Sequence, residues 1–157
     1  RASAYYKNIQ VFLESKKLEQ LLQKYDYTLE VKLHPIFSMY KECFSFSSSR
    51  ICMIEKTEPA ENYGICITDI SSFAYDYMFH GIPVYWFLPD VVEFKSGMNG
   101  YRNMGEKEYW EKVAISPEAL LEQLLAYLKD GTYEGIVTEF YETLSPMEEI
   151  YQKEIRR

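Results

Sequence analysis

Two adjacent serines, Ser71 and Ser72, stand where a buried apolar run gives way to a helical pattern. Their hydroxyl groups, the free backbone amides of a helix start and the positive end of the helix dipole would meet in one small volume. Such donors suit a diphosphate. Serine is also a preferred N-cap residue, so ordinary helix capping is the alternative. The serines alone indicate either a phosphate site or a cap.

Titratable side chains stand close to these serines or at the ends of other apolar runs. Asp69 precedes the serines, Asp76 follows them, Asp90 ends a later run, and His34 precedes Pro35 at the end of another. Histidine changes charge near neutral pH, so it can pair with a phosphate or donate a proton. The plainer alternatives are a turn residue for Asp69, a solvent-facing side chain for Asp76 and a satisfied surface histidine for His34.

Other motifs add little specific chemistry. Tyr101, in the glycine-bearing stretch 91–110, is the tyrosine best placed to stack on a base. His80 precedes Gly81 at an expected helix end and is interpreted as a favourable charge there, without a chemical role. The sequence contains no G-x-G-x-x-G pattern, P-loop, catalytic triad or C-x-x-C pair. We therefore expect no metal and no cofactor.

Hydrophobic periodicity predicts the elements that position these residues. Apolar side chains recur every three or four positions in segments expected to be helical, namely 9–25, 73–80, 117–130, 136–144 and 147–155. Short apolar or alternating runs predict strands at 27–33, 50–54, 64–68, 84–88 and 113–115. Alternating strands and helices predict an α/β fold, a Rossmann-like parallel sheet with helices on both faces. Ligands bind such sheets at the carboxyl ends of the strands, where His34, Asp69 and Asp90 are expected.

Composition limits the classes of function. The chain of 157 residues is 47% hydrophobic and 17% aromatic, which predicts one folded domain over 1–157. Its net charge of -7 repels phosphate polymers, so nucleic acid is not expected as a partner. Cys43, Cys52 and Cys66 resemble reduced, mostly buried thiols, as in a reducing cytoplasm, and no apolar run approaches the length of a membrane span.

Four motifs occur in an order and spacing typical of one enzyme family. They are Leu33-His34-Pro35, the Asp-x-Ser-Ser-x-x-x-Asp block within 67–77, Gly81-Ile82-Pro83-Val84, and Asp90 with Phe94. Over about residues 25–130 the chain resembles the CDP-glycerol glycerophosphotransferases, the family of teichoic acid polymerases and primases. Two departures are Ile70, where the family has Tyr, and Arg102, which follows a Gly-aromatic pair that an Arg usually precedes.

The resemblance implies specific roles for the motif residues. The chain would be the nucleotide-binding C-terminal half of a GT-B type transferase, lacking the N-terminal acceptor domain and the first strand. His34 would be catalytic and assist the phosphate and leaving group, while Ser71 and Ser72 would bind the diphosphate and Asp69 and Asp76 would fix the turn. The other residues expected to bind substrate are Asp90, Tyr101, Arg102 and Arg1, the last as the Arg of a P-T-W-R motif.

The implied reaction moves glycerol phosphate, or a related polyol phosphate, from a CDP-linked donor to a polymer or lipid-linked acceptor, as in teichoic-acid-like or capsular polysaccharide synthesis. We expect a cytoplasmic enzyme, peripheral at the inner face of the cell membrane, whose fragment alone is inactive. The alternatives are a GT-B glycosyltransferase or epimerase that uses a UDP- or CMP-sugar, and a non-catalytic nucleotide-binding or interaction module.

Overall fold

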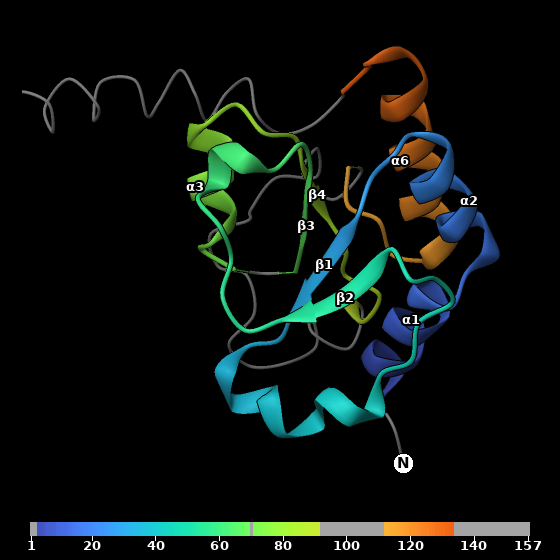
Figure 1. Ribbon diagram of the computed structural model, residues 1–157, viewed down its shortest axis with the longest axis vertical. Coiled ribbons are helices and arrows are strands. Elements are labelled where there is room, and N and C mark those ends of the chain that lie inside the picture. The colour runs from blue at the N-terminus through green and yellow to red at the C-terminus, as the bar shows by residue number, and fades with distance from the viewer. Residues whose placement is uncertain (1–2, 70, 92–111, 134–157) are drawn as a thin grey trace, which may run out of the picture.

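The computed structural model of the protein describes residues 3–69, 71–91 and 112–133, which form an α/β fold of short strands and helices (Figure 1). The helices are α1 (Ala4–Leu13), α2 (Lys16–Lys24), α3 (Ala74–Phe79) and α6 (Pro117–Asp130), with the 3₁₀ helices η1 (Pro35–Cys43) and η2 (Ala60–Asn62). The strands are β1 (Leu29–Lys32), β2 (Ile51–Ile54), β3 (Cys66–Thr68) and β4 (Val84–Trp86). The predicted α/β class is confirmed, and the helices expected at 136–144 and 147–155 lie outside the described residues.

The four strands form two parallel pairs instead of the single sheet expected from the sequence. β1 pairs with β2, with Leu29 opposite Ile51, and β3 pairs with β4, with Cys66 opposite Val84. A parallel bridge adds Ala114 beside the end of β4, where the sequence predicted a brief strand. Because every pair is parallel, each connection crosses back over the strands, and η1 and α3 lie in two of these crossovers.

Helices α1, α2 and α6 cover one face of the strands, at the right of Figure 1. Tyr85 of β4 and the following Phe87 point into this core and meet Phe12 of α1 and Leu120 of α6. The rings of Phe12 and Phe87 lie 5.8 Å apart. Leucines at three- and four-residue spacing in α2 and α6 fill the rest, as the periodicity predicted.

Helix α3 covers the opposite face of β3 and β4. Val84 and Trp86 alternate with the residues that face the first core, and they pack against Ala74 and Met78 of α3. All residues of β4 are buried, as expected for a strand with a helix on each face. Helices therefore lie on both faces of this pair.

Helix α6 begins and ends where the sequence predicted. The Ser116 hydroxyl accepts a hydrogen bond from the Ala119 amide at 3.2 Å, and Pro117 occupies the first turn. Gly131 ends the helix with φ of 75°, a left-handed conformation that suits glycine. This helix is a fixed element against which the strands pack.

The three cysteines are free thiols, of which Cys66 is buried, whereas Cys43 and Cys52 are exposed. Burial raises the pKa of the Cys66 thiol to about 12, which keeps it protonated and unreactive. The expectation that Cys52 is buried was wrong, because it points to the face of β2 opposite the core that holds Ile51. No helix in the described part of the chain is long and apolar enough to cross a membrane.

Replacing Leu120 by alanine should lower the free energy of unfolding by about 2–5 kcal/mol, because the side chain is fully buried between α6 and the strands. Leu125→Ala is the matched control on the same helix, since Leu120 is 0% exposed and Leu125 42%. Urea denaturation measures both. Equal losses in the two variants would contradict the assigned core.

Candidate functional site

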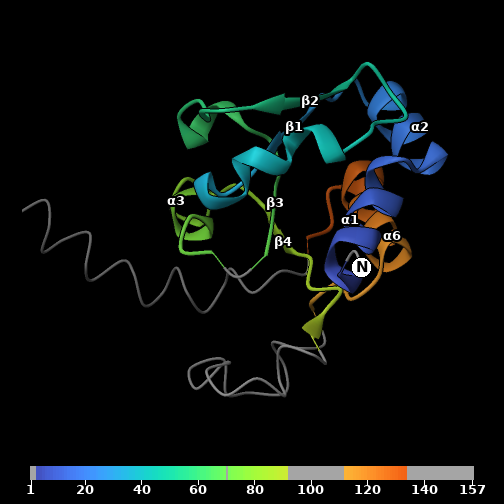
Figure 2. The same ribbon diagram turned by 90° about the horizontal axis from the view of Figure 1, so that it is seen from below.

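The described strands β1, β3 and β4 end on the same side of the molecule, the lower side in Figure 1 and the side facing the viewer in Figure 2. Helix α1 also begins there, and η1 and the turn before α3 follow directly from β1 and β3. His34, Asp69 and Asp90 each follow one of these strands within four residues, so the backbone at these positions lies toward this side, as the sequence predicted.

Asp69 is held by Tyr5, a residue that no sequence motif indicates. The Tyr5 hydroxyl donates a hydrogen bond to the Asp69 carboxylate at 3.0 Å. Burial raises the pKa of Tyr5, and the negative charges of Asp69 and, to a smaller extent, Asp90 raise it further. Tyr5 therefore stays protonated as a donor, and both carboxylates lie near the start of α1.

Sequence alone gave no means of finding Tyr5. It lies in the first turn of α1, whose N-cap is Ser3. That helix begins at Ala4, five residues before the predicted helical segment 9–25. Its partner is 64 positions away along the chain. Only the packing of α1 against the strand ends brings the two residues together.

Ser71 and Ser72 form a turn that precedes helix α3, whose N-cap residue is Phe73 and not a serine. The Ser71 amide donates to the Asp69 carbonyl at 3.0 Å, and its hydroxyl accepts from the Phe73 amide at 3.3 Å. The Ala74 amide then donates to the Ser71 carbonyl in a tight 3₁₀ step. The hydroxyl of Ser71 is thus partly engaged in the turn, whereas Ser72 is exposed.

His34 is the N-cap residue of the 3₁₀ helix η1 and is exposed. Its Nδ1 atom accepts a hydrogen bond from the Ile36 amide at 3.3 Å. In the neutral ring this leaves the proton on Nε2, the nitrogen on the far side of the ring. The rigid capping geometry expected beside Pro35 is present, and Nε2 is the atom available to a ligand.

The side chain of Lys32, the last residue of β1, contacts Phe73, which directly follows the serine turn. Its ammonium group lies 4.7 Å from the centre of the Phe73 ring, a cation–π contact. A positive charge is thus placed beside the turn in a chain whose net charge is negative. Within the described residues no hydrogen bond joins His34 to Ser71 or Ser72.

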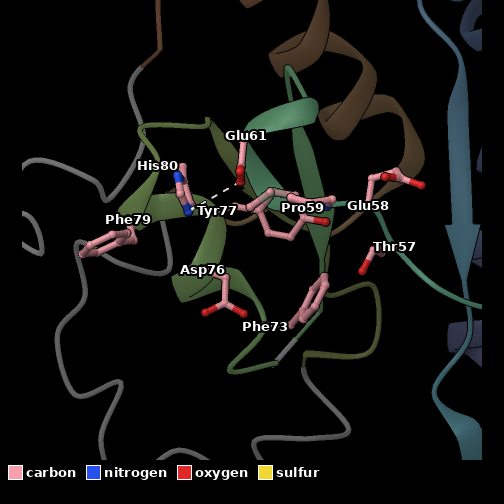
Figure 3. A pocket seen from close by; sticks show the side chains of 10 residues that line it. Thr57, Glu58, Pro59, Glu61, Phe73, Asp76, Tyr77, Phe79 and His80 are labelled. Atoms are coloured by element: carbon pink, nitrogen blue, oxygen red, sulfur yellow. Dashed lines mark ion pairs between the residues drawn. The ribbon is translucent and has the colours of Figure 1, made fainter. Parts of the chain in front are cut away.

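A pocket of about 340 Å³ lies between α3 and the segment before β3 (Figure 3). Its walls are formed by Thr57, Glu58, Pro59, Ala60, Glu61, Phe73, Asp76, Tyr77, Phe79 and His80. Asp76 and Phe73 lie at the end nearer the serine turn, and Glu61 and His80 at the other (Figure 3). The pocket therefore extends along α3 from Phe73, the residue that follows Ser72.

Aromatic rings and carboxylates give the pocket its chemistry. The rings of Phe73 and Tyr77 meet edge to face with centres 5.2 Å apart, and burial raises the pKa of Tyr77 to about 12. His80 Nε2 lies 3.8 Å from a Glu61 carboxylate oxygen. The interpretation of His80 as only a helix-end charge thus missed its pairing with Glu61, which lies 19 positions earlier in the chain.

Three predicted site residues, Arg1, Tyr101 and Arg102, lie outside the described residues. Among the residues that the structure describes, no group of three or more histidine, cysteine or acidic side chains could hold a metal ion. The described candidates are therefore the serine turn with Asp69 and Tyr5, the nearby Lys32 and His34, and the pocket along α3.

The fold and the polar strand ends define an α/β protein with a candidate ligand site at the carboxyl ends of parallel strands. Residues 1–148 match the profile of the family described as CDP-Glycerol:Poly(glycerophosphate) glycerophosphotransferase. The chain belongs to this family of transferases, which confirms the resemblance seen in the sequence. Searches of curated proteins and of solved structures gave no significant match.

Removing the Tyr5 hydroxyl should change how stability depends on pH. An unfolded tyrosine loses its proton near pH 10, whereas Tyr5 in the folded protein keeps it, because burial and the carboxylates raise its pKa. The folded state then binds more protons, so the free energy of unfolding falls as pH rises above about 10. In Tyr5→Phe the free energy of unfolding should fall less steeply with pH, by a slope that corresponds to at most one bound proton.

The measurement is denaturant unfolding at a series of pH values from about 9 to 11.5. Tyr6→Phe is the control on the neighbouring position of α1, because the Tyr6 hydroxyl donates to the neutral carbonyl of Cys43. Identical slopes for the wild-type protein and Tyr5→Phe would show that neither burial nor the carboxylates raise the pKa of Tyr5 in the folded protein.

Proposed function

We propose that this chain is the donor-binding part of an enzyme that transfers glycerol phosphate, or a related polyol phosphate, from a CDP-linked donor to an acceptor hydroxyl. Membership of the glycerophosphotransferase family supports the chemistry. The single structural observation that carries the proposal is the pocket along α3, which begins at Phe73, the residue that directly follows the serine turn. A nucleoside diphosphate needs two such adjoining subsites, one for phosphates and one for the nucleoside.

The pocket is the nucleoside subsite in this proposal. Phe73 and Tyr77 supply apolar ring surface for a base. Asp76 lines the pocket at the end nearer the serine turn, where its carboxylate would accept hydrogen bonds from ribose hydroxyls. Glu61, steadied by His80, would accept from the exocyclic amino group of cytosine, a donor that uracil lacks.

The serine turn is the diphosphate subsite. Ser71 and Ser72 contribute hydroxyls and backbone amides, and Lys32 contributes the nearby positive charge. Asp69 would repel a phosphate if its carboxylate faced the ligand directly. Its hydrogen bond from Tyr5, and the bond from the Ser71 amide to its carbonyl, instead make it a residue that fixes the turn.

In the reaction, an oxygen of the acceptor hydroxyl bonds to the β-phosphorus of the donor while the bond from that phosphorus to the bridging oxygen breaks. Glycerol phosphate passes to the acceptor and CMP leaves, while the acceptor proton goes to a base. His34 would place its Nε2–H toward the departing phosphate and stabilise the charge that grows there. Positioning and charge stabilisation account for most of the catalysis of phosphoryl transfer.

The wider assignment also belongs to this proposal. The chain would be the nucleotide-binding half of a GT-B type transferase, with the base and the acceptor site in another domain. The acceptor would be a polymer or lipid-linked chain of a teichoic-acid-like or capsular polysaccharide, and the enzyme would act at the cytoplasmic face of the membrane through peripheral contact. Arg1, Asp90, Tyr101 and Arg102 would complete the substrate contacts.

Donor binding should raise the thermal midpoint of the full-length protein. A ligand at about 100 times its dissociation constant stabilises the folded state by roughly 2.7 kcal/mol. We expect this shift with CDP-glycerol or CDP-ribitol and a much smaller one with UDP-sugars at equal concentration. A larger shift with UDP-sugars would favour the glycosyltransferase alternative, and no shift with any nucleotide would contradict a donor site.

The double variant Ser71→Ala with Ser72→Ala should diminish the shift caused by CDP-glycerol, because it removes donors aimed at the diphosphate. Ser116→Ala is the matched control, since it removes the N-cap of α6 and costs about 1 kcal/mol of stability at a site away from the pocket. Comparing shifts rather than midpoints separates binding from stability. An undiminished shift in the serine variant would exclude the turn as the phosphate site.

His34→Gln should lower kcat of the full-length enzyme by about 100-fold or more with a small change in KM for the donor, because the histidine acts on the leaving phosphate. Lys41→Gln, at an exposed position of the same 3₁₀ helix, is the control. Steady-state release of CMP measures both variants. A kcat equal to that of the wild-type enzyme would remove His34 from the mechanism.

A further inference from the structure

The 3₁₀ helix η1 turns its most apolar side chains toward solvent. In a 3₁₀ helix, side chains three positions apart lie in one row. Ile36 and Met39 form such a row and are 71% and 75% exposed. The neighbouring row holds Phe37 and Tyr40, which are 54% and 51% exposed. The outward side of η1 is therefore its apolar side, the reverse of a helix that packs on a core.

These four side chains, which we call the η1 apolar face, belong to neither hydrophobic core of the described residues. Helix η1 is attached to α1 at its C-terminal end, where the Tyr6 hydroxyl donates to the Cys43 carbonyl and the Tyr6 ring lies 5.2 Å from that of Phe44. Its other end is capped by His34. The helix is thus fixed at both ends while its apolar face stays uncovered.

The η1 apolar face is also the largest group of its kind in the described part of the chain. The other exposed large apolar side chains there occur at most two to an element. Single exposed apolar side chains are common on soluble proteins, whereas a contiguous group marks a surface that another molecule covers.

The charges near the η1 apolar face suit an anionic partner. The stretch 31–41 contains two lysines, one histidine and no acidic residue, and Glu30 and Glu42 lie at its borders. Residues 3–54 contain seven lysine or arginine residues and five acidic ones, whereas the rest of the described chain contains three and nine. The excess of negative charge therefore belongs to the part of the sequence that does not carry η1.

The size of the face favours a lipid surface over a second copy of the chain. A stable interface between two proteins buries about 800 Å² of each partner and involves roughly 20–30 residues a side. Four partly exposed side chains supply only a small part of such an interface. A bilayer sets no comparable minimum, because interfacial binding increases with each apolar group that is inserted. Tyrosine, present as Tyr40, is also enriched where a membrane meets water.

We propose that η1 is a membrane-docking element, which inserts its apolar face into the headgroup region of a bilayer that contains anionic lipids. The inference rests on the proposed action of the enzyme at a membrane. It concerns a surface outside the donor site, so the two can be tested apart.

Docking through η1 would bring the candidate site to the membrane surface. Helix η1, cyan in Figure 1, lies at the lower edge of that view, on the side where β1, β3 and β4 end. His34 is its N-cap residue, and the His34 ring lies 6.3 Å from the ring of Phe37. A lipid-linked acceptor anchored in the same bilayer would therefore meet the chain next to His34.

Co-sedimentation of the full-length protein with vesicles of phosphatidylglycerol and phosphatidylcholine in equal amounts tests the proposal. Ile36→Ser with Met39→Ser should raise the lipid concentration needed for half-maximal binding by about tenfold or more, because the most exposed row is lost. Ile115→Ser with Leu125→Ser is the matched control, since these side chains are 55% and 42% exposed outside η1, and it should bind like the wild-type protein. Absent wild-type binding, or equal binding by the η1 variant, would overturn the proposal.

The same variant separates membrane docking from donor binding and from a protein partner. Neither Ile36 nor Met39 lines the pocket or belongs to the serine turn, so CDP-glycerol should shift the thermal midpoint of the variant as much as that of the wild-type protein. A wild-type protein with the donor shift but without vesicle binding would overturn the docking element and leave the proposed function standing. A wild-type dimer that the variant abolishes, without vesicle binding, would assign the face to a second copy instead.

Methionine methyl signals locate the contact directly. With the full-length protein bound to nanodiscs of the same lipids, a nitroxide-labelled lipid should broaden the methyl signal of Met39. The methyl signal of Met78, which is 1% exposed beneath α3, is the internal control and should stay sharp. A Met39 signal that nitroxide lipid leaves unchanged in the bound protein would overturn the proposal.

Discussion

The rest of the structure depends on the common direction of its strands. Because each pair is parallel, the connections cross back over the strands, and helices come to cover both faces. Strands covered in this way must be apolar along their length, as β4 is. Polar side chains can then gather only beyond the strand ends, where Asp69, the serine turn and the start of α1 meet. The location of the candidate site follows from the direction of the strands.

The sequence predicted those features that depend on neighbouring residues. Ser116, Pro117 and Gly131 mark the ends of α6 because capping is a local interaction. Apolar runs located each strand of the described residues, although the strands are shorter than predicted. The contact between Tyr5 and Asp69 and the pairing of His80 with Glu61 join distant segments, so no local pattern indicates them. The division into two pairs was also unpredictable from periodicity, which identifies strands but not their neighbours.

Electrostatics explain how an acidic chain could hold a diphosphate. Long-range attraction is absent at a net charge of -7, so binding must rely on groups that touch the ligand. The ammonium group of Lys32 lies over the ring of Phe73, the residue that follows the exposed Ser72. The Tyr5 hydroxyl occupies the Asp69 carboxylate with a hydrogen bond. Together these contacts offer positive charge and donors at the turn while a nearby negative charge is engaged by the protein.

The most direct test of the central claim is a titration of isotope-labelled full-length protein with CDP-glycerol, followed by backbone amide chemical shifts. We expect saturable changes that are largest at Ser71 and Ser72, extend along α3 to Asp76 and include the Glu61 segment across the pocket. Saturable changes confined to residues away from the strand ends, with the Ser71 and Ser72 amides unmoved, would contradict it.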